Sequence, residues 1–290
     1  MILVTGATGN VGRPTVRTLL ERGAEVRVFT RDRSRLGDIA DKVDVVLGDF
    51  ADESALRAAM RGIEKMYLHA VGGGNEEVSA AITAARAEDV AHIVHLSSLS
   101  ASLPGPTAAQ WFLAREALIK DAGFRWTMLR GGFFMSNVLR SVPAIRDGKV
   151  VRGLAGRFAP IDTRDVGAVA AAALTEPGHE GKAYDLTGPE LMDAREQFAI
   201  LADVIGRPIA FEEMSPEDVI AEARATGAPE DRIAFARAVA EGLAAGQWPV
   251  VTDAVEQVTG RKPGTFRQWC IDNSRAFDPV DRPESPLAEA

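Results

Sequence analysis

Cysteine, tyrosine and long apolar runs are scarce in this chain of 290 residues. Its one cysteine, Cys270, excludes an internal disulfide and a thiolate-rich metal site. No apolar stretch approaches the roughly 18–20 residues that a membrane-spanning helix needs. Only two tyrosines, Tyr67 and Tyr184, are available for acid–base chemistry. We therefore predict a protein with no metal site and no membrane partner.

Negative charge predominates in the composition. The chain has 41 acidic residues against 33 basic ones, a formal net charge of −8 and a pI near 5.2. Such a protein is repelled by phosphate backbones and anionic lipid surfaces, so we predict no nucleic-acid partner. The first strand is expected to start near Met1, which leaves no stretch for a signal peptide. With a single cysteine, this favours a reducing, cytoplasmic location; the oligomeric state stays open.

Short β-branched segments alternate with amphipathic helical segments through the first half of the chain. Strands are predicted over residues 1–5, 25–29, 43–47, 65–70, 92–96 and 126–129. Helices are predicted over residues 11–22, 53–61, 76–88 and 108–122. This repeat is typical of parallel strands joined by right-handed crossovers, with helices on both faces of the sheet. The fold class is therefore α/β, with a doubly wound parallel sheet.

The second half of the chain has a different pattern. An alanine-rich helix is expected over residues 165–174, and a further strand over residues 181–186. The pattern then becomes mostly helical, with one short strand-like piece over residues 208–213. These segments predict a smaller, mostly helical C-terminal lobe attached to the sheet domain.

Domain boundaries follow from these changes of pattern. We predict a nucleotide-binding domain over residues 1–188, in which residues 130–160 contribute to a substrate cleft, and a helical substrate lobe over residues 189–277. Residues 278–290 carry three prolines among acidic residues, so we expect a disordered tail there.

A glycine-rich loop joins the first predicted strand to the first predicted helix, and it reads Thr5-Gly6-Ala7-Thr8-Gly9-Asn10-Val11-Gly12. Gly6 permits the tight turn, Gly9 lets the backbone approach a phosphate, and Gly12 allows close packing of helix on strand. The helix N-terminus behind the loop presents N–H groups and a positive dipole end to a pyrophosphate. The loop therefore predicts a dinucleotide cofactor.

The end of the second predicted strand indicates which dinucleotide is bound. Selection of NAD(H) usually places a carboxylate there to hold the ribose hydroxyls. This chain instead has Arg31, followed by Asp32, Arg33 and Arg35. A guanidinium binds phosphate bidentately, so Arg31 favours NADP(H), with its 2′-phosphate, over NAD(H). The alternative is a solvated basic turn that binds no ligand.

Asp49 and Phe50 end the third predicted strand. A carboxylate at this position can accept a hydrogen bond from an adenine amino group, and the ring of Phe50 can pack near the base. The alternative is that Asp49 caps the next helix. Both interpretations are compatible with the sequence, and the first would extend the cofactor site from the glycine loop to the third strand.

Further segments carry a family resemblance. They are Gly48-Asp49-Phe50, Leu96-Ser97-Ser98 and residues 126–137, 187–190, 205–208 and 258–263. Together with the glycine loop they resemble the NmrA-like proteins, an atypical extended branch of the short-chain dehydrogenase/reductase superfamily. The resemblance covers nearly the whole chain, up to about Phe277. It implies a Rossmann-type sheet with a cofactor across the strand ends, and a substrate cleft between the sheet and the helical lobe.

The resemblance also implies particular cofactor contacts. Thr8, Asn10 and Val11 would join the glycines around the pyrophosphate, and Ala70 and Val71 would lie near the adenine-side ribose. Family members include quinone and ketone reductases, as well as redox-sensing regulators that bind the cofactor without turning it over.

The usual proton donor of such reductases is missing. Hydride reduction of a carbonyl requires a proton for the oxyanion that forms. Most short-chain reductases take it from a tyrosine with a lysine four residues later, but neither Tyr67 nor Tyr184 has a lysine at that spacing. Trp111 and Arg115 stand in the corresponding place, and an indole is no general acid. Trp111 is expected in the cleft wall or in the core, and Arg115 either holds a ribose or substrate oxygen or is simply exposed.

Ser97 and Ser98 are the remaining catalytic candidates. They end the fifth predicted strand, at the sheet edge where such folds place ligands, and could orient a carbonyl as hydrogen-bond donors. The alternative is that both hydroxyls satisfy local backbone groups. A quinone or polyaromatic substrate would suit a site without a strong acid, because its reduced oxyanion is delocalised and less basic.

Three apolar residues after the sixth predicted strand could form the substrate slot. Phe133, Phe134 and Met135, together with Trp111, would offer an aromatic ring an apolar surface. The alternative is that the two phenylalanines fill the interface between the lobes. The sequence therefore predicts an NADPH-dependent oxidoreductase that reduces a ketone, quinone or related aromatic molecule. The competing hypothesis is an NADP(H)-binding, redox-sensing regulator with no turnover.

Overall fold

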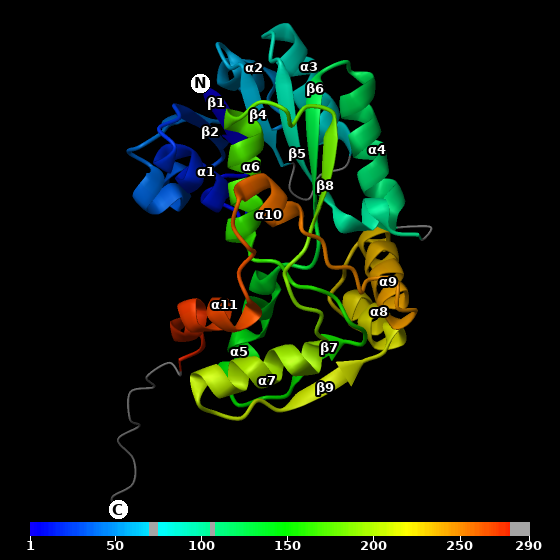
Figure 1. The fold of residues 1–290 in the computed structure, drawn as a ribbon. Coiled ribbons are helices and arrows are strands. Elements are labelled where there is room, and N and C mark those ends of the chain that lie inside the picture. The colour runs from blue at the N-terminus through cyan, green and yellow to red at the C-terminus, as the bar shows by residue number, and fades with distance from the viewer. Residues whose placement is uncertain (70–74, 105–107, 279–290) are drawn as a thin grey trace, which may run out of the picture.

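The computed structural model describes residues 1–69, 75–104 and 108–278 (Figure 1). Seven strands form one sheet, in the order β3-β2-β1-β4-β5-β6-β8, and every neighbouring pair is parallel. The strands are β1 (Ile2–Thr5), β2 (Val26–Thr30), β3 (Asp44–Leu47), β4 (Lys65–Leu68), β5 (His92–Ser98), β6 (Arg125–Gly131) and β8 (Lys182–Leu186). The chain runs outward from β1 to β3 and then returns to β4, which confirms the predicted doubly wound α/β fold.

Alternate side chains of each strand point to opposite faces, which gives the sheet two hydrophobic cores. In β1, Ile2 and Val4 lie in one core and Leu3 lies in the other. The first face is covered by α1 (Gly12–Glu21) and α6 (Thr163–Thr175). The second face is covered by α2 (Glu53–Met60), α3 (Asn75–Ala87) and α4 (Ala108–Asp121). Short 3-10 segments, η1 (Arg33–Ile39) and η2 (Leu99–Ser102), follow β2 and β5.

A second lobe lies below the carboxyl ends of the strands in Figure 1. Its elements are η3 (Met135–Ser141), α5 (Val142–Arg146), β7 (Val151–Leu154), α7 (Ala194–Ile205), β9 (Phe211–Met214), α8 (Pro216–Ala225), α9 (Glu230–Ala244), α11 (Phe266–Asn273) and η4 (Ser274–Phe277). The predicted strand-like piece is β9, and it pairs in parallel with β7. A separate hydrophobic core, which includes Val138, Phe198 and Trp269, holds most of these elements together, whereas α9 contributes Val239 and Leu243 to a further core with Leu99 of η2.

The two lobes are interleaved in sequence. Apolar residues of the segment 135–151, predicted within the first domain, pack in the core of the second lobe. In the opposite direction, α10 (Ala254–Thr259) returns from the second lobe and packs on α6 and β8, where Ala254 and Val255 join a core of the sheet. A division at residue 188 therefore does not separate the two cores. The predicted tail lies, from residue 279 onward, outside the described residues. Across the described ranges, no helix combines the length and apolar character needed to span a membrane.

Helices α1 and α6 approach each other closely at Gly167. A β-carbon at Gly167 would lie 2.8 Å from Cβ of Pro14 and 2.8 Å from the backbone nitrogen of Thr15. Real β-carbons do not approach backbone atoms so closely, so this helix pair requires glycine at that point. The contact presses α6 against the first turns of α1, directly behind the glycine loop.

We expect Gly167→Ala to lower the free energy of unfolding by ~1–3 kcal/mol, because the added methyl overpacks a contact with rigid backbone. In an unconstrained helix the same change would stabilise by ~1 kcal/mol. Urea denaturation followed by circular dichroism measures the difference. An unchanged or increased midpoint would show that the two helices are not packed this tightly.

Candidate cofactor and substrate site

The glycine loop runs from the end of β1 into α1. Gly6 has φ +65°, a left-handed conformation that strains other residues. A β-carbon on Gly12 would overlap the carbonyl oxygen of Gly6, so the helix starts this close to the strand only with glycine. Val11, at the N-cap of α1, has no side-chain oxygen with which to cap the first turn. The N–H groups of that turn are therefore suited to a pyrophosphate.

The tip of the loop faces a cleft. Thr8, Gly9 and Asn10 line this cleft of about 340 Å³ together with Ser136 from η3 and residues of α11. Asn10 Nδ2 donates to Ser136 Oγ at 3.4 Å, which links the loop to the second lobe. Among the described residues, a β-carbon on Gly9 would closely meet a single atom, a carbonyl oxygen at 3.2 Å. The loop therefore leaves room for a ligand beside Gly9, as a dinucleotide requires.

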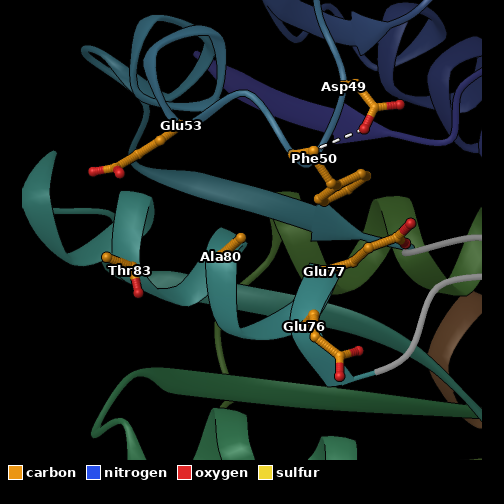
Figure 2. A pocket seen from close by; sticks show the side chains of 8 residues that line it. Asp49, Phe50, Glu53, Glu76, Glu77, Ala80 and Thr83 are labelled. Atoms are coloured by element: carbon orange, nitrogen blue, oxygen red, sulfur yellow. Dashed lines mark hydrogen bonds between the residues drawn. The ribbon is translucent and has the colours of Figure 1, made fainter.

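Asp49 and Phe50 follow β3 and line a pocket of about 390 Å³ (Figure 2). Asp49 Oδ1 accepts a hydrogen bond from the backbone nitrogen of Ala51 at 3.0 Å, which leaves Oδ2 for a ligand. Phe50 packs edge-on against Phe29, with ring centroids 5.9 Å apart. The helix cap proposed for Asp49 is wrong, because Asp52 caps α2. The predicted residues Ala70 and Val71 lie outside the described residues.

Arg31 lies beside this pocket, at the end of β2. Its side chain is 76% exposed, and Nη1 lies 3.9 Å from Asp49 Oδ2. Asp32, the competing carboxylate, caps η1 and accepts from the backbone nitrogen and the hydroxyl of Ser34 at 2.8 and 2.7 Å. These hydrogen bonds lower the pKa of Asp32. The carboxylate is thus engaged within its own turn, whereas the guanidinium of Arg31 extends into solvent.

A cavity of about 740 Å³ lies between the carboxyl ends of the strands and the second lobe. The sheet contributes His69 after β4, residues 96–98 of β5 and Gly131 at the end of β6. The second lobe contributes β7, α8, α9 and Trp248. Parallel sheets of this type bind their ligands at this edge, so the cavity is the candidate substrate site.

Aromatic rings form much of the cavity wall. Phe133 and Phe134 both line it, as predicted from the sequence. Phe133 also packs on Phe158 and Trp248, with ring centroids 4.3 and 4.9 Å away. Phe133 thus fills the interface between the lobes and borders the cavity at the same time, so the two interpretations of its role do not exclude each other.

Two predicted substrate residues do not line the cavity. Met135 is fully buried in the core of the second lobe. Trp111 is 39% exposed and stacks on Phe235 at 6.0 Å, and it is not among the residues that line the cavity. Phe112, one position along α4, lines the cavity instead. Trp111 and Phe112 are neighbours on α4, so rotating the helix by one residue would exchange which of them lines the cavity. The sequence of α4 is only weakly amphipathic and does not indicate which face of the helix points toward the cavity.

Other lining residues were missed because they come from the second lobe. Phe235 and Trp248 are contributed by α9 and the segment after it. An aromatic residue in a helical lobe is as typical of a core as of a ligand site. These rings reach the edge of the sheet only because α9 docks against α4, and no sequence motif predicts that contact.

Ser97 belongs to a buried charged network. Its hydroxyl donates to Glu116 Oε1 at 2.7 Å. The same carboxylate accepts from Arg130 Nε and Nη2 at 2.9 and 2.8 Å, and from Lys120 Nζ at 3.1 Å. Because the Ser97 hydroxyl proton points at Glu116, the hydroxyl oxygen can offer a ligand only its lone pairs. In this arrangement Ser97 is a hydrogen-bond acceptor and not the predicted carbonyl-orienting donor.

Ser98 lies at the cavity and also caps η2. Its oxygen accepts hydrogen bonds from the backbone nitrogen and the hydroxyl of Ser100, at 3.3 and 3.0 Å. The hydroxyl hydrogen of Ser98 is not used in these two contacts, so Ser98 can still donate to a substrate oxygen. Of the two predicted serines, Ser98 is therefore the one whose geometry allows the donor role.

Neither tyrosine can act as a proton donor in the cavity. Tyr67 is fully buried in the core of the sheet, and burial raises its pKa. The Tyr184 hydroxyl is bonded to His179 Nδ1 at 2.8 Å, and this residue does not line the cavity. His69 does line it, but burial, followed by the charge of Arg115, lowers its pKa to about 4. Near neutral pH this imidazole is therefore uncharged.

Comparison with known proteins agrees with the geometry. The family model described as NAD(P)H-binding matches residues 6–177, from the glycine loop to the end of α6. The chain therefore belongs to the NAD(P)H-binding family. The predicted resemblance to the NmrA-like, atypical short-chain dehydrogenase/reductases is also confirmed, and the chain groups with oxidoreductases.

Three related proteins illustrate this grouping. The (4-alkanoyl-5-oxo-2,5-dihydrofuran-3-yl)methyl phosphate reductase of Streptomyces griseus is 40% identical, covering 96% of this chain and 100% of that one. The NAD(P)H azoreductase of Xenophilus azovorans is 33% identical, covering 96% and 99%. The crystal structure of an NADPH-dependent quinone oxidoreductase from Escherichia coli, complexed with NADPH, superposes with a TM-score of 0.81 at 28% identity, covering 96% and 100%.

The Glu116 network makes the fold sensitive to acid. Burial alone would raise the pKa of Glu116, but Arg130, Ser97 and Lys120 overcome it and hold the pKa at about 2. A carboxyl with a pKa depressed from 4.5 stabilises the fold above about pH 4.5, and this stabilisation is lost as the pH falls towards 2.

We expect Glu116→Gln to lower the free energy of unfolding by ~3 kcal/mol at neutral pH, since Arg130 loses its counter-charge.

Urea denaturation at several pH values measures this effect. The stability of Glu116→Gln should depend less on pH between 5 and ~2 than that of the natural protein. Glu241→Gln is the matched control, because Glu241 pairs with Arg237 on an exposed helix face and contributes at most ~0.5 kcal/mol. Equal losses in the two variants would show that the Glu116 network is not a buried charge cluster.

Proposed function

We propose that the protein is an NADPH-dependent oxidoreductase that reduces a conjugated acceptor, such as a quinone or an aromatic or unsaturated ketone. One observation carries the proposal: a cavity walled by aromatic rings adjoins the sheet edge, and neither a tyrosine nor a lysine is among its described lining residues. Such a site can position a flat ring and exclude water, but its described lining residues offer no tyrosine–lysine acid with which to protonate a localised alkoxide.

The acceptor must therefore be one whose reduction does not depend on rapid protonation by a side chain of the protein. Bound NADPH would supply a hydride, and the conjugated oxygen of the acceptor takes the displaced electron pair. Delocalisation makes that oxygen weakly basic, so water can supply the second hydrogen. Ser98 is placed to donate a hydrogen bond to the developing negative charge, and Phe133 and Phe134 provide a surface for the ring.

The named relatives support this substrate class. A quinone, an azo compound and an alkanoyl dihydrofuranone are all conjugated acceptors in which added hydride leaves a delocalised anion. The particular acceptor of this chain is a ketone or quinone in our proposal. We also propose a cytoplasmic location, which fits a protein whose single cysteine is free and buried.

NADPH oxidation tests the function. Purified protein is mixed with NADPH and a panel of quinones, enones and azo dyes, and the absorbance of the reduced nicotinamide is followed. We expect saturable oxidation that Gly9→Val abolishes, because its side chain would fill the space beside the loop. Ala58→Val, an exposed change on α2, should leave the rate unaltered.

Tight NADPH binding without turnover across the whole panel would reject the enzyme. It would instead support the alternative of a redox-sensing regulator, for which the cavity would serve to bind an effector and not a substrate.

We further propose that the cofactor is NADP(H) in preference to NAD(H). Two features support this: Arg31 extends into solvent beside the Asp49 pocket, and the carboxylate of Asp32 is engaged by Ser34. The turn after β2 thus offers the guanidinium of Arg31, while the carboxylate of Asp32, which stands where NAD(H) usually needs one, is engaged by Ser34.

Removal of this guanidinium separates the two cofactors. We expect Arg31→Ala to weaken NADPH binding by ~1–3 kcal/mol and to leave NADH binding nearly unchanged. Titration calorimetry with each cofactor measures the two affinities. Arg33→Ala is the control, because Arg33 pairs with Asp41 at 3.1 Å, away from the pocket. Equal losses for NADPH and NADH in Arg31→Ala would contradict the preference.

A further inference from the structure

One hydroxyl group connects the substrate cavity to a buried charge cluster. The cluster consists of Glu116 on α4, Lys120 one turn later on the same helix, and Arg130 on β6. None of these three residues is among the described residues that line the cavity, whereas Ser97, which donates to Glu116, does line it. Within the part of the chain that the structure describes, the cluster therefore meets the cavity at the side chain of Ser97.

The charge of Glu116 fixes the direction of its hydrogen bond with Ser97. Burial would raise the pKa of Glu116, but Arg130, Ser97 and Lys120 hold it at about 2, so the carboxyl group is ionised. An ionised carboxylate accepts hydrogen bonds and cannot donate them. The single proton of the Ser97 hydroxyl therefore lies in the 2.7 Å contact with Glu116 Oε1. Two lone pairs remain on the serine oxygen.

These lone pairs are open to a donor from the cavity. Across the described ranges, the hydrogen bond of Ser97 Oγ is the one that it donates to Glu116, and no side chain donates to this oxygen. Ser97 is 5% exposed and belongs to the cavity wall, so a bound ligand is the partner that can reach it. An acceptor in a buried wall favours a ligand that brings an N–H or O–H group and disfavours one that brings a second acceptor.

The Ser97 oxygen lies on the same side of the sheet as the aromatic part of the cavity. Side chains alternate along a strand, so Ser97 shares a face with Ile93, which packs in the core beneath α2, α3 and α4. On α4, Phe112 lies one turn before Glu116, on the same face of the helix, and lines the cavity. Its ring packs on Phe235 at 6.1 Å. The acceptor oxygen is thus beside the rings that would hold a flat substrate.

Ser98 and Ser97 offer a ligand opposite halves of a hydrogen bond. Ser98 still has a proton to donate, and by the same alternation it shares a face with Leu96, in the core beneath α1 and α6. The glycine loop leads into α1 on that face, so the phosphates of a cofactor do not require the Ser97 oxygen. A donor and an acceptor on different faces contact different parts of a bound substrate.

We propose that Ser97 determines specificity, and that the substrate is a conjugated ring compound with a neutral amino or hydroxyl group that donates a hydrogen bond to the Ser97 oxygen. A ring that carries only acceptor substituents would place oxygen against oxygen at this point. Glu116 is a positioning residue, because it acts on the substrate through the orientation of Ser97. The kinetic part of this inference rests on the proposed reductase function.

Two quinones that differ in one substituent test the proposal. NADPH oxidation is measured with 2-amino-1,4-naphthoquinone, which can donate from its N–H, and with 2-methoxy-1,4-naphthoquinone, which can only accept. The amino-to-methoxy ratio of kcat/KM is compared between proteins, because the intrinsic reactivities of the quinones then cancel. We expect Ser97→Ala to lower this ratio about fivefold, as for the loss of one neutral hydrogen bond. Ser97→Cys, whose sulfur is a weak acceptor, should lower it in the same direction.

Ser102→Ala is the matched control. Ser102 accepts a hydrogen bond from Arg130 Nη1 at 2.8 Å, so it belongs to the same network, but it is not among the described lining residues. This variant removes the same hydroxyl group outside the cavity, and the ratio should stay within about twofold. Equal falls in Ser97→Ala and Ser102→Ala would overturn the proposal, since they would reflect a disturbed network and not a contact with the substrate.

Glu116→Gln tests the positioning role. An amide both donates and accepts, so the Ser97 proton is no longer confined to one direction and the serine can donate into the cavity. We expect the amino-to-methoxy ratio to fall, measured at a temperature where circular dichroism shows the variant to be folded. A lower stability with an unchanged ratio would show that Glu116 does not orient Ser97 toward the substrate.

NADPH affinity distinguishes a substrate contact from a cofactor contact. It is measured by calorimetry in Ser97→Ala, whose folding is checked by circular dichroism. Unchanged affinity supports the proposal. A loss of about fivefold, as for one hydrogen bond, would assign the Ser97 oxygen to the amide group of the nicotinamide and overturn it.

Two ligands that are not reduced keep the test independent of turnover. Calorimetry measures the binding of 2-naphthol and of 2-methoxynaphthalene to the natural protein and to Ser97→Ala. If no quinone is turned over but Ser97→Ala weakens 2-naphthol about fivefold and leaves 2-methoxynaphthalene unchanged, the acceptor site stands and the reductase function fails. If quinones are reduced but the amino-to-methoxy ratio is the same in both proteins, the function stands and the acceptor site is wrong.

Discussion

The backbone contact between Gly6 and Gly12 is the constraint on which the rest of the structure depends. A β-carbon at Gly12 would overlap the carbonyl of Gly6, so α1 can begin directly against β1 only without side chains there. This contact aims the first turn of α1 at the cofactor site. It also sets α1 where α6 packs on it through Gly167, and α6 in turn carries α10 from the second lobe. The conformation of the glycine loop and the packing of one sheet face thus have a common origin.

The active-site chemistry is shaped by where polar groups are already committed. Ser97 gives its proton to Glu116, Tyr184 is bonded to His179, and Tyr67 is enclosed in the core. These commitments stabilise the fold, but they remove the acids that could protonate a localised alkoxide. In the function that we propose, such a site works by position and apolar enclosure. Conjugated acceptors would fit it because they need little help in carrying negative charge.

Local signals explain which predictions succeeded. The glycine loop needs particular backbone angles within eight consecutive residues, and the parallel strands need short β-branched segments between helices, so both are written in contiguous sequence. Phe133 follows β6 directly and could be assigned to the cavity for the same reason. Trp111 and Met135 were misplaced because a single residue of helix or loop rotation moves a side chain from a cavity to a core or an outer face.

The sequence by itself determined the fold class, the cofactor family and the absence of a tyrosine–lysine pair, because each depends on residue types at short spacing. Only the tertiary structure decided what the cavity presents to a substrate. The Ser97–Glu116 hydrogen bond spans 19 residues, and the packing of Phe112 on Phe235 depends on how α9 docks against α4. Contacts between distant segments arise from the packing of whole helices and strands, and the spacing of residue types within a short segment does not predict that packing.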